Sequence, residues 1–175
     1  MKSILLLRHA KSDWGTPGQP DHERPLNGRG EGAAETMAAH IAALKPPLDL
    51  ILCSTAVRAR QTLTPLLDRL LPAPSTSLET GLYLASEEAL LDRLQALGPD
   101  VGRVLMIGHN DGMWDLAVAL AGKGPAPALA NLTDKFPTGA LAVLDAAIDR
   151  WPDLAAGQAT LTSFVRPRDL GADGQ

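Results

Sequence analysis

Three short, mostly apolar segments constrain the fold more than any other feature of the sequence. They are Ser3–Leu7, Leu48–Cys53 and Arg103–Ile107, and none shows a sustained alternation of apolar and polar residues. A strand that is apolar on both faces is typical of a parallel sheet covered by helices on both sides. Between these segments, apolar residues recur at helical spacing. The pattern therefore predicts an α/β fold, a three-layer α/β/α sandwich with a mostly parallel central sheet.

Caps and breakers predict where the helices begin and end. Asn27 is suited to cap the first helix, and a second helix is expected to begin after Ser54 and to carry its apolar face to Leu71. Pro65 lies within that second pattern, so we expect a kink or a break near Thr64. The remaining expected elements are a strand around Ser77–Leu78, a helix opened by Ser86, a helix over Asp111–Ala121, a loop over Gly122–Asn131, and strands over Ala140–Leu144 and Ala159–Phe164.

Length and composition limit the class of protein. A chain of 175 residues fits one domain over 1–175, with a loose tail from about residue 170. A net charge of -4 argues against a generic nucleic-acid-binding protein, and the single cysteine, Cys53, rules out an intramolecular disulfide. No apolar stretch is as long as a signal-peptide core or a membrane span. We therefore expect a cytoplasmic protein that binds neither nucleic acid nor membrane, with a monomer as the favoured state.

Arginine and histidine side chains follow all three of these strands. Arg8 and His9 follow the first strand, Arg58 lies about one turn after the second, and His109 and Asn110 follow the third. Ligands of open α/β sheets bind at the carboxyl ends of the strands, so we expect these side chains to converge. Two guanidinium groups suit a tetrahedral anion, and a neutral imidazole between them can attack phosphorus. The cluster therefore predicts phosphoryl transfer.

Other interpretations of the same residues stay open. Any one of these side chains, taken singly, could instead be a surface residue or a histidine satisfied in the core, and His22 and His40 are assigned to that class. His9 and His109 could also ligate a metal ion. However, no third ligand stands at suitable spacing beside them, and the flanking arginines would repel a cation. We expect no metal and no cofactor.

Several segments resemble the motifs of a known family. Leu7–Ser12 (LRHAKS), Ser54–Thr62 (STAVRARQT) and Gly108–Asn110 (GHN) resemble, in order, the three motifs of the histidine phosphatase superfamily. The strings RHAKSDW, RPLNGRG, FPTGALAVL and FVRPRDL are similar to its SixA-type branch, which dephosphorylates phosphohistidine on proteins. The resemblance runs from residue 1 to about residue 170. It implies the phosphoglycerate mutase-like form of the α/β/α sandwich.

The resemblance also implies a role for each core residue. His9 would be the nucleophile that becomes transiently phosphorylated, while Arg8 and Arg58 would hold the phosphoryl oxygens. His109 would donate a hydrogen bond to the phosphoryl group. Asn110 could touch substrate or orient its loop, or it could simply begin a helix.

The proton donor to the leaving group is less well defined. Many relatives use a carboxylate after the second motif, and Glu79 is the best-placed residue, although it could be an exposed loop acid. Asp111 is a second candidate, but an acid at a helix start is already explained by the helix dipole. Arg24, in RPLNGRG, could bind substrate. Further cations could widen the positive field around the mouth or be solvated surface charges; these are Lys11, Arg60, Arg166 and Arg168.

The leading functional hypothesis is a metal-independent phosphohydrolase that works through a phosphohistidine intermediate. Its expected substrate is phosphohistidine on a protein partner, such as a histidine-phosphotransfer domain. The short connections between elements predict a shallow, open pocket that can admit a phosphorylated side chain. One alternative is a phosphatase for small phosphate esters. An alternative of another class is a non-catalytic phosphoprotein-binding module, whose sign would be the loss of His9 or of an arginine.

Overall fold

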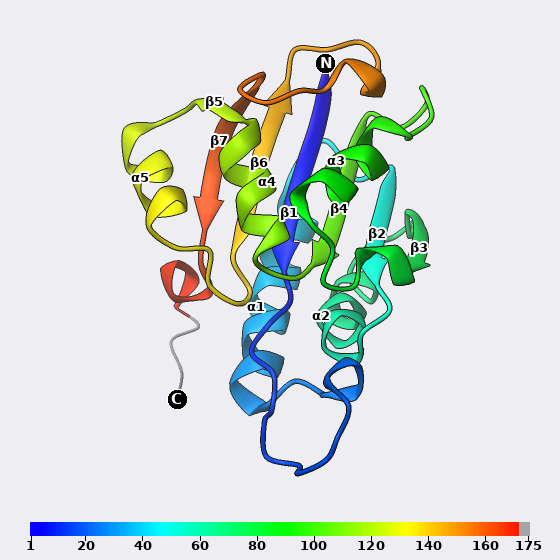
Figure 1. The fold of residues 1–175 in the computed structure, drawn as a ribbon, viewed down its shortest axis with the longest axis vertical. Helices are drawn as coiled ribbons and strands as arrows, with labels where there is room; N and C mark the ends of the chain where they lie inside the picture. Colours follow the sequence, from blue (N-terminus) through cyan, green and yellow to red (C-terminus); the bar gives the residue numbers. More distant parts are fainter. Residues whose placement is uncertain (172–175) are drawn as a thin grey trace.

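The computed structural model describes residues 1–171, in which helices cover both faces of a central sheet (Figure 1). The strands of this sheet are β1 (Lys2–Arg8), β2 (Leu50–Ser54), β3 (Ser75–Glu79), β4 (Arg103–Gly108), β5 (Ala121–Lys123), β6 (Leu141–Ala146) and β7 (Ala159–Val165). The α-helices are α1 (Gly28–Ala43), α2 (Val57–Leu67), α3 (Glu87–Gln95), α4 (Gly112–Leu120) and α5 (Ala126–Asp134). Short 3-10 helices lie in the connections: η1 (Asp21–Glu23), η2 (Thr80–Leu82), η3 (Trp151–Asp153) and η4 (Pro167–Leu170).

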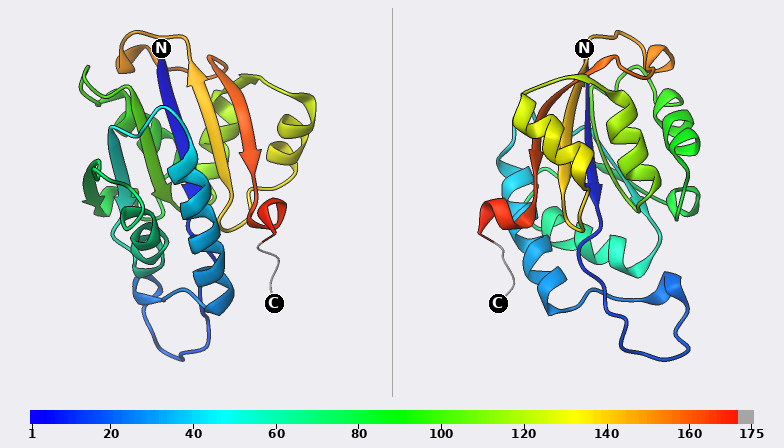
Figure 2. Two further views of the ribbon diagram at one scale, coloured as in Figure 1. Left: turned by 180° about the vertical axis from the view of Figure 1, so that it is seen from behind. Right: turned by 60° about the vertical axis from the view of Figure 1, so that its left-hand side comes forward.

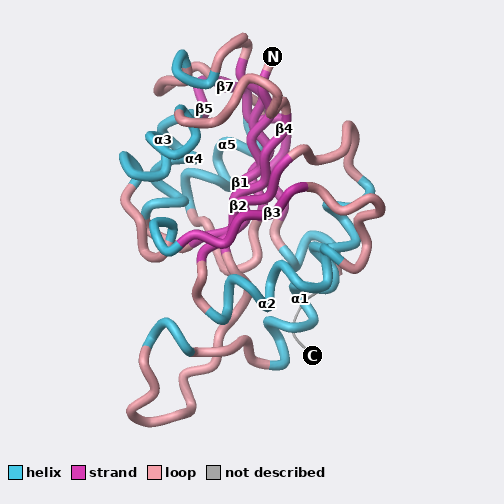
Figure 3. Tube along the Cα trace, turned by 90° about the vertical axis from the view of Figure 1, so that its right-hand side faces the viewer, coloured by secondary structure: helices cyan, strands magenta, loops and turns pink. Residues whose placement is uncertain are grey.

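The sheet is mostly parallel, as the apolar segments predict. Its strand order is β3-β2-β4-β1-β6-β7-β5, and β6 runs antiparallel to both of its neighbours while the other pairs are parallel. Helices α1 and α2 cover one face, and α3, α4 and α5 cover the other (Figures 2 and 3). The three-layer α/β/α architecture is therefore confirmed. No helix of residues 1–171 is both long enough and apolar enough to cross a membrane.

Strand β1 shows why its sequence lacks alternation. Successive side chains of a strand point to opposite faces of the sheet. Ile4 and Leu6 accordingly pack into the core beneath α3, α4 and α5, whereas Leu5 and Leu7 pack against α1 and α2. Both faces of β1 are buried, so each position favours an apolar residue.

Helix α2 differs from its predicted form. It continues through Pro65 and ends at Leu67, so the predicted break near Thr64 is wrong. Proline has no backbone N–H, so the carbonyl of Gln61 loses its helical partner, and the helix ends two residues after Pro65. Leu71, expected on the face of this helix, lies beyond its end and is exposed.

The prediction of a loop over Gly122–Asn131 is also wrong, because β5 and α5 occupy much of this segment. Proline is tolerated in the first turn of a helix, and Pro125 and Pro127 stand at the start of α5 rather than inside it. Leu132 of α5 is buried in the core. At the carboxyl end, the predicted loose tail begins at about residue 170, and Leu170 is the last residue of η4. The rest of the predicted tail, 172–175, lies outside the described residues.

The carboxyl ends of β1, β2 and β4 lie at one edge of the sheet. Arg8 pairs in register with Gly108, and Cys53 pairs with Ile107. The residues that directly follow these positions in the sequence are therefore neighbours in space. This edge is where the predicted site residues meet.

Candidate active site

His9, Arg58 and His109 come from three segments and form one buried cluster. His9 follows β1, His109 follows β4, and Arg58 lies in the first turn of α2. Nε of Arg58 lies 3.3 Å from Nε2 of His9, and its Nη2 lies 3.3 Å from Nδ1 of His109. The side chains are only 7%, 2% and 2% exposed, in that order. The fold therefore brings His9, Arg58 and His109 together, as expected from their positions after the three strands.

One hydrogen bond fixes the tautomer of His9. Its Nδ1 lies 2.7 Å from the carbonyl oxygen of Ala10, which can only accept, so Nδ1 carries the proton. Nε2 is left with its lone pair and receives the Nε–H of Arg58. Burial, reinforced by the charges of His109 and Arg58, lowers the pKa of His9 to about 3. At neutral pH the ring is therefore uncharged, and its unprotonated nitrogen faces the cluster.

His109 has the opposite tautomer. A guanidinium group has no acceptor, so Nη2 of Arg58 donates to Nδ1 of His109 and the proton sits on Nε2. That Nε2–H donates to the hydroxyl of Ser54 at 2.7 Å. Burial and the charge of Arg58 lower the pKa of His109 to about 4. A bound dianion would oppose this shift, so His109 can gain a proton on Nδ1 when a phosphoryl group binds.

Arg8 and Asn110 share an anchor beside the cluster. Nη1 of Arg8 and Nδ2 of Asn110 both donate to the carbonyl of Phe136, at 3.0 and 2.9 Å. Nε of Arg8 and Oδ1 of Asn110 are buried without a hydrogen-bond partner among residues 1–171. A buried guanidinium N–H that lacks a protein partner can serve a bound anion. The charge of Arg8 also helps to lower the pKa of both histidines.

Asp21 in η1 is part of the site, and the sequence analysis missed it. Its Oδ2 accepts from Nη2 of Arg58 at 3.0 Å and from the hydroxyl of Tyr83, and its carbonyl accepts from Nη1 of Arg58 at 2.6 Å. Bonds from Tyr83, Arg24 and Arg58 hold the pKa of Asp21 well below its usual range. Asp21 therefore fixes the guanidinium of Arg58. The sequence signal is weak, since an acid three residues before Arg24 indicates only a local ion pair.

The side chain of Arg24 bonds within the loop that contains Asp21. Its Nε and Nη2 bond to Oδ1 of Asp21 at 3.0 and 2.9 Å, and its Nη1 donates to Ser12 at 2.8 Å. The guanidinium also stacks on the ring of Trp14, 3.4 Å from the ring centroid. Arg24 thus reaches the site through Asp21, and its donors are already engaged.

The two carboxylates considered as proton donors lie in different surroundings. Both oxygens of Glu79 bond to Arg93 in α3 at 2.8 Å, and Arg93 lowers the pKa of this carboxyl. Among residues 1–171, Glu79 makes no hydrogen bond to His9, Arg58 or His109. Burial lowers the pKa of Arg8, and the charge of Asp111 opposes this shift, so Asp111 lies close enough to Arg8 to interact with its charge.

The arrangement is suited to an anion and to nucleophilic attack on it. Two arginines supply fixed positive charge, and an uncharged imidazole presents a lone pair between them and His109. Within residues 1–171, no three His, Cys, Asp or Glu side chains gather where they could hold a metal ion. Burial raises the pKa of Cys53 to about 12, so its thiol stays protonated and is a poor nucleophile.

Comparison with known proteins defines the class. The sequence profile of the histidine phosphatase superfamily (branch 1) matches residues 4–80, a span that contains Arg8, His9 and Arg58. A structure from Agrobacterium tumefaciens, provisionally assigned as phosphohistidine phosphatase SixA, is 34% identical to this chain with a TM-score of 0.80. The match covers 95% of this chain and 98% of that one. The chain therefore belongs to the histidine phosphatase superfamily and is a phosphatase.

Within the superfamily, the chain belongs to the SixA-type branch. A second structure with the same provisional SixA assignment, from Nakamurella multipartitia, is 27% identical with a TM-score of 0.79, over 95% of this chain and 96% of that one. An uncharacterised protein of Mycobacterium tuberculosis is 38% identical over 164 residues, which cover 93% of this chain and 100% of that protein. The resemblance predicted from the motifs is confirmed at the level of family and branch.

Proposed function

We propose that this chain removes the phosphoryl group from phosphohistidine on a protein partner, by way of a phosphoenzyme formed at His9. The observation that carries the proposal is the fixed tautomer of His9. Its Nδ1–H is held by Ala10, so Nε2 offers a lone pair beside the guanidinium of Arg58. An imidazole that attacks phosphorus has to be unprotonated at the attacking nitrogen and aimed in this way.

The first step transfers the phosphoryl group to the enzyme. Nε2 of His9 attacks phosphorus and the P–N bond of the substrate breaks, with the bonding electron pair leaving on the substrate nitrogen. When the other ring nitrogen of the substrate carries a proton, the leaving imidazole is neutral and needs no proton from the enzyme. Arg8, Arg58 and a protonated His109 would stabilise charge on the phosphoryl oxygens during the transfer.

The second step restores the enzyme. Water attacks phosphorus, the P–Nε2 bond breaks, and His9 recovers its lone pair. Both hydrogens of the water leave with the phosphate, which then equilibrates with solvent. Arg8 and Arg58 would hold the phosphoryl group in both steps, so one anion site serves the whole reaction.

The carboxylates of Glu79 and Asp21 are already bound to other side chains, which supports a substrate with a P–N bond over a phosphate ester. An ester oxygen needs a proton as it leaves, whereas a protonated phosphohistidine does not. Glu79 is bound to Arg93, and Asp21 is bound to Arg24, Arg58 and Tyr83. Of the two carboxylates considered as proton donors, Asp111 is therefore the better candidate in a small-ester phosphatase.

Phosphate release from a phosphohistidine-bearing protein tests the proposal, with para-nitrophenyl phosphate run in parallel and excess EDTA present. We expect wild type to release phosphate from phosphohistidine, His9→Ala to lose that activity, and His40→Gln, in the last turn of α1, to keep it. Faster turnover of the ester would favour the small-ester alternative. Binding of the phosphoprotein with no release of phosphate would favour a binding module.

A further inference from the structure

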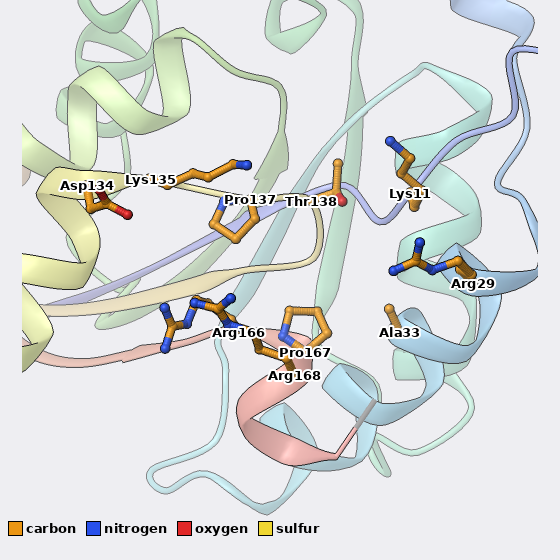
Figure 4. Close-up of a pocket in the computed structure, with 10 residues that line it drawn as sticks. All are labelled: Lys11, Arg29, Ala33, Asp134, Lys135, Pro137, Thr138, Arg166, Pro167 and Arg168. Carbon is orange, nitrogen blue, oxygen red and sulfur yellow. The ribbon is translucent and has the colours of Figure 1, made fainter. Parts of the chain in front are cut away.

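A basic groove opens beside the catalytic cluster. It is a cavity of about 380 Å³ between the first turns of α1, the turn before β6, and η4. Figure 4 shows Lys11 and Arg29 on one side of it, with Lys135 and Arg166 facing them from the other. We call this cavity the basic groove; its lining residues are Lys11, Arg29, Ala33, Asp134, Lys135, Pro137, Thr138, Arg166, Pro167 and Arg168.

The charge of the groove contrasts with that of the whole chain. Five of its lining residues are cationic and one, Asp134, is acidic, although the chain has a net charge of -4. Arg166 is paired with Asp169. Among residues 1–171, the other four cations, which are Lys11, Arg29, Lys135 and Arg168, form no ion pair. Unpaired like charges held close together repel one another, and an anionic ligand would relieve that repulsion.

The groove and the catalytic cluster are built on neighbouring backbone segments. Lys11 stands two residues after His9, and Pro137 follows Phe136, whose carbonyl anchors Arg8. The backbone N–H of Gly139, next to Thr138, bonds to the carbonyl oxygens of both Arg8 and His9. A ligand in the groove therefore lies against the same backbone that positions the nucleophile.

The distribution of charge favours an extended anion over a single phosphate. A phosphate site concentrates its donors on one point. Here the cations stand on opposite walls, and Asp134 lies among them. Several carboxylates spread along a protein surface match this pattern better.

We propose that the basic groove binds Asp and Glu side chains that flank the phosphohistidine of a protein partner. This inference rests on the proposed function, because it describes how the same site selects its substrate. Charge pairs at the rim of an interface mainly affect association and selectivity, so the effect should depend on salt.

Synthetic peptides test the inference without knowledge of the partner. Three peptides carry a central phosphohistidine, made with phosphoramidate, and are flanked by Asp and Glu, by Asn and Gln, or by Lys. The readout is the ratio of kcat/KM for the acidic peptide to that for the neutral peptide. For wild type we expect a ratio of about ten in low salt, decreasing as added salt screens the charges.

A groove variant and a matched control locate the effect. Lys11→Gln/Lys135→Gln/Arg168→Gln should bring the ratio close to one. Lys45→Gln/Lys123→Gln, which removes two exposed cations at the opposite edge of the sheet, should leave it unchanged. An equal wild-type rate for all three peptides would overturn the docking inference while leaving the proposed function intact.

Peptide binding tests the inference even if no peptide is hydrolysed. In that case the proposed function fails, and fluorescence anisotropy of labelled, unphosphorylated acidic and neutral peptides reports on the groove alone. Tighter binding of the acidic peptide, lost in the groove variant, supports docking. If inorganic diphosphate binds through these cations and the acidic peptide does not, the groove is a small-anion subsite and the docking inference is wrong.

Discussion

At the scale of single residues, three of the site's side chains occupy positions that can be predicted from the sequence, and one does not. Arg8, His9 and His109 directly follow apolar strands, and the geometry of a parallel sheet brings such positions together. Asp21 could not be predicted in this way, because it lies in a loop without periodicity. Its contact with Arg58 spans 37 residues of the chain.

Substitution of Asp21 tests whether this residue positions the guanidinium of Arg58. We expect Asp21→Asn to lower kcat/KM about tenfold to a hundredfold, because the guanidinium of Arg58 loses the carboxylate that fixes its position. Asp21 also raises the pKa of His109, so its removal should move the His109 titration, followed by NMR, below its value of about 4. Partial rescue by Asp21→Glu would support the positioning role. An unchanged His109 titration would argue against it.

The two buried histidines make stability depend on pH. Their pKa values in the folded chain, about 3 for His9 and about 4 for His109, lie below the ordinary value of 6.5. Between pH 6.5 and 4 the unfolded chain therefore binds more protons than the folded one, and stability is lost as pH falls through this range. We expect urea denaturation to show a loss of the order of a few kcal/mol from pH 7 to pH 4.5. His109→Gln should reduce this loss, and an equal loss in that variant would contradict the assignment.

At the scale of helices and strands, the central elements are predictable and the edges are not. Strands β1, β2 and β4 are buried on both faces, so their composition identifies them. Helix α5 combines prolines with alanines, and only its packing through Leu132 distinguishes it from a loop. The end of α2 was misjudged because the apolar pattern continues past the last helical turn into exposed residues.

Gly30 in the first turn of α1 permits a close crossing that positions the segment after His9. A Cβ at Gly30 would lie 1.9 Å from the carbonyl oxygen of Lys11, whereas a Cβ at Gly32 would meet nothing within 4 Å. We expect Gly30→Ala to destabilise the fold by ~1–3 kcal/mol through overpacking. Gly32→Ala, its matched control, should be neutral or stabilising because alanine favours the helix. Urea denaturation of both variants checks this, and equal midpoints would show that the crossing can relax.

At the scale of the whole molecule, the fold gathers two kinds of positive charge at one edge of the sheet. Arg8 and Arg58 are anchored next to the nucleophile by Phe136 and Asp21, and the cations of the basic groove stand more freely beside it. The first set is suited to a phosphoryl group and the second to the surface that presents it. The chain could thus separate chemistry from partner selection within one small α/β sandwich.

Built-in cations also predict how the activity responds to chelators. Because Arg8 and Arg58 can supply the positive charge that phosphoryl transfer needs, excess EDTA should leave phosphate release within about twofold of its untreated rate. Restoration of a lost rate by added Mg²⁺ or Zn²⁺ would show that a metal ion takes part.

The proposed mechanism depends on the transfer of the phosphoryl group to Nε2 of His9. Rapid quenching at alkaline pH during turnover of a phosphohistidine substrate, followed by mass spectrometry and ³¹P NMR, measures this directly. We expect a transient phosphoryl group on Nε2 of His9, absent in His9→Ala and retained in His40→Gln. Turnover at the wild-type rate in His9→Ala, or phosphate found on another residue of the active enzyme, would contradict it.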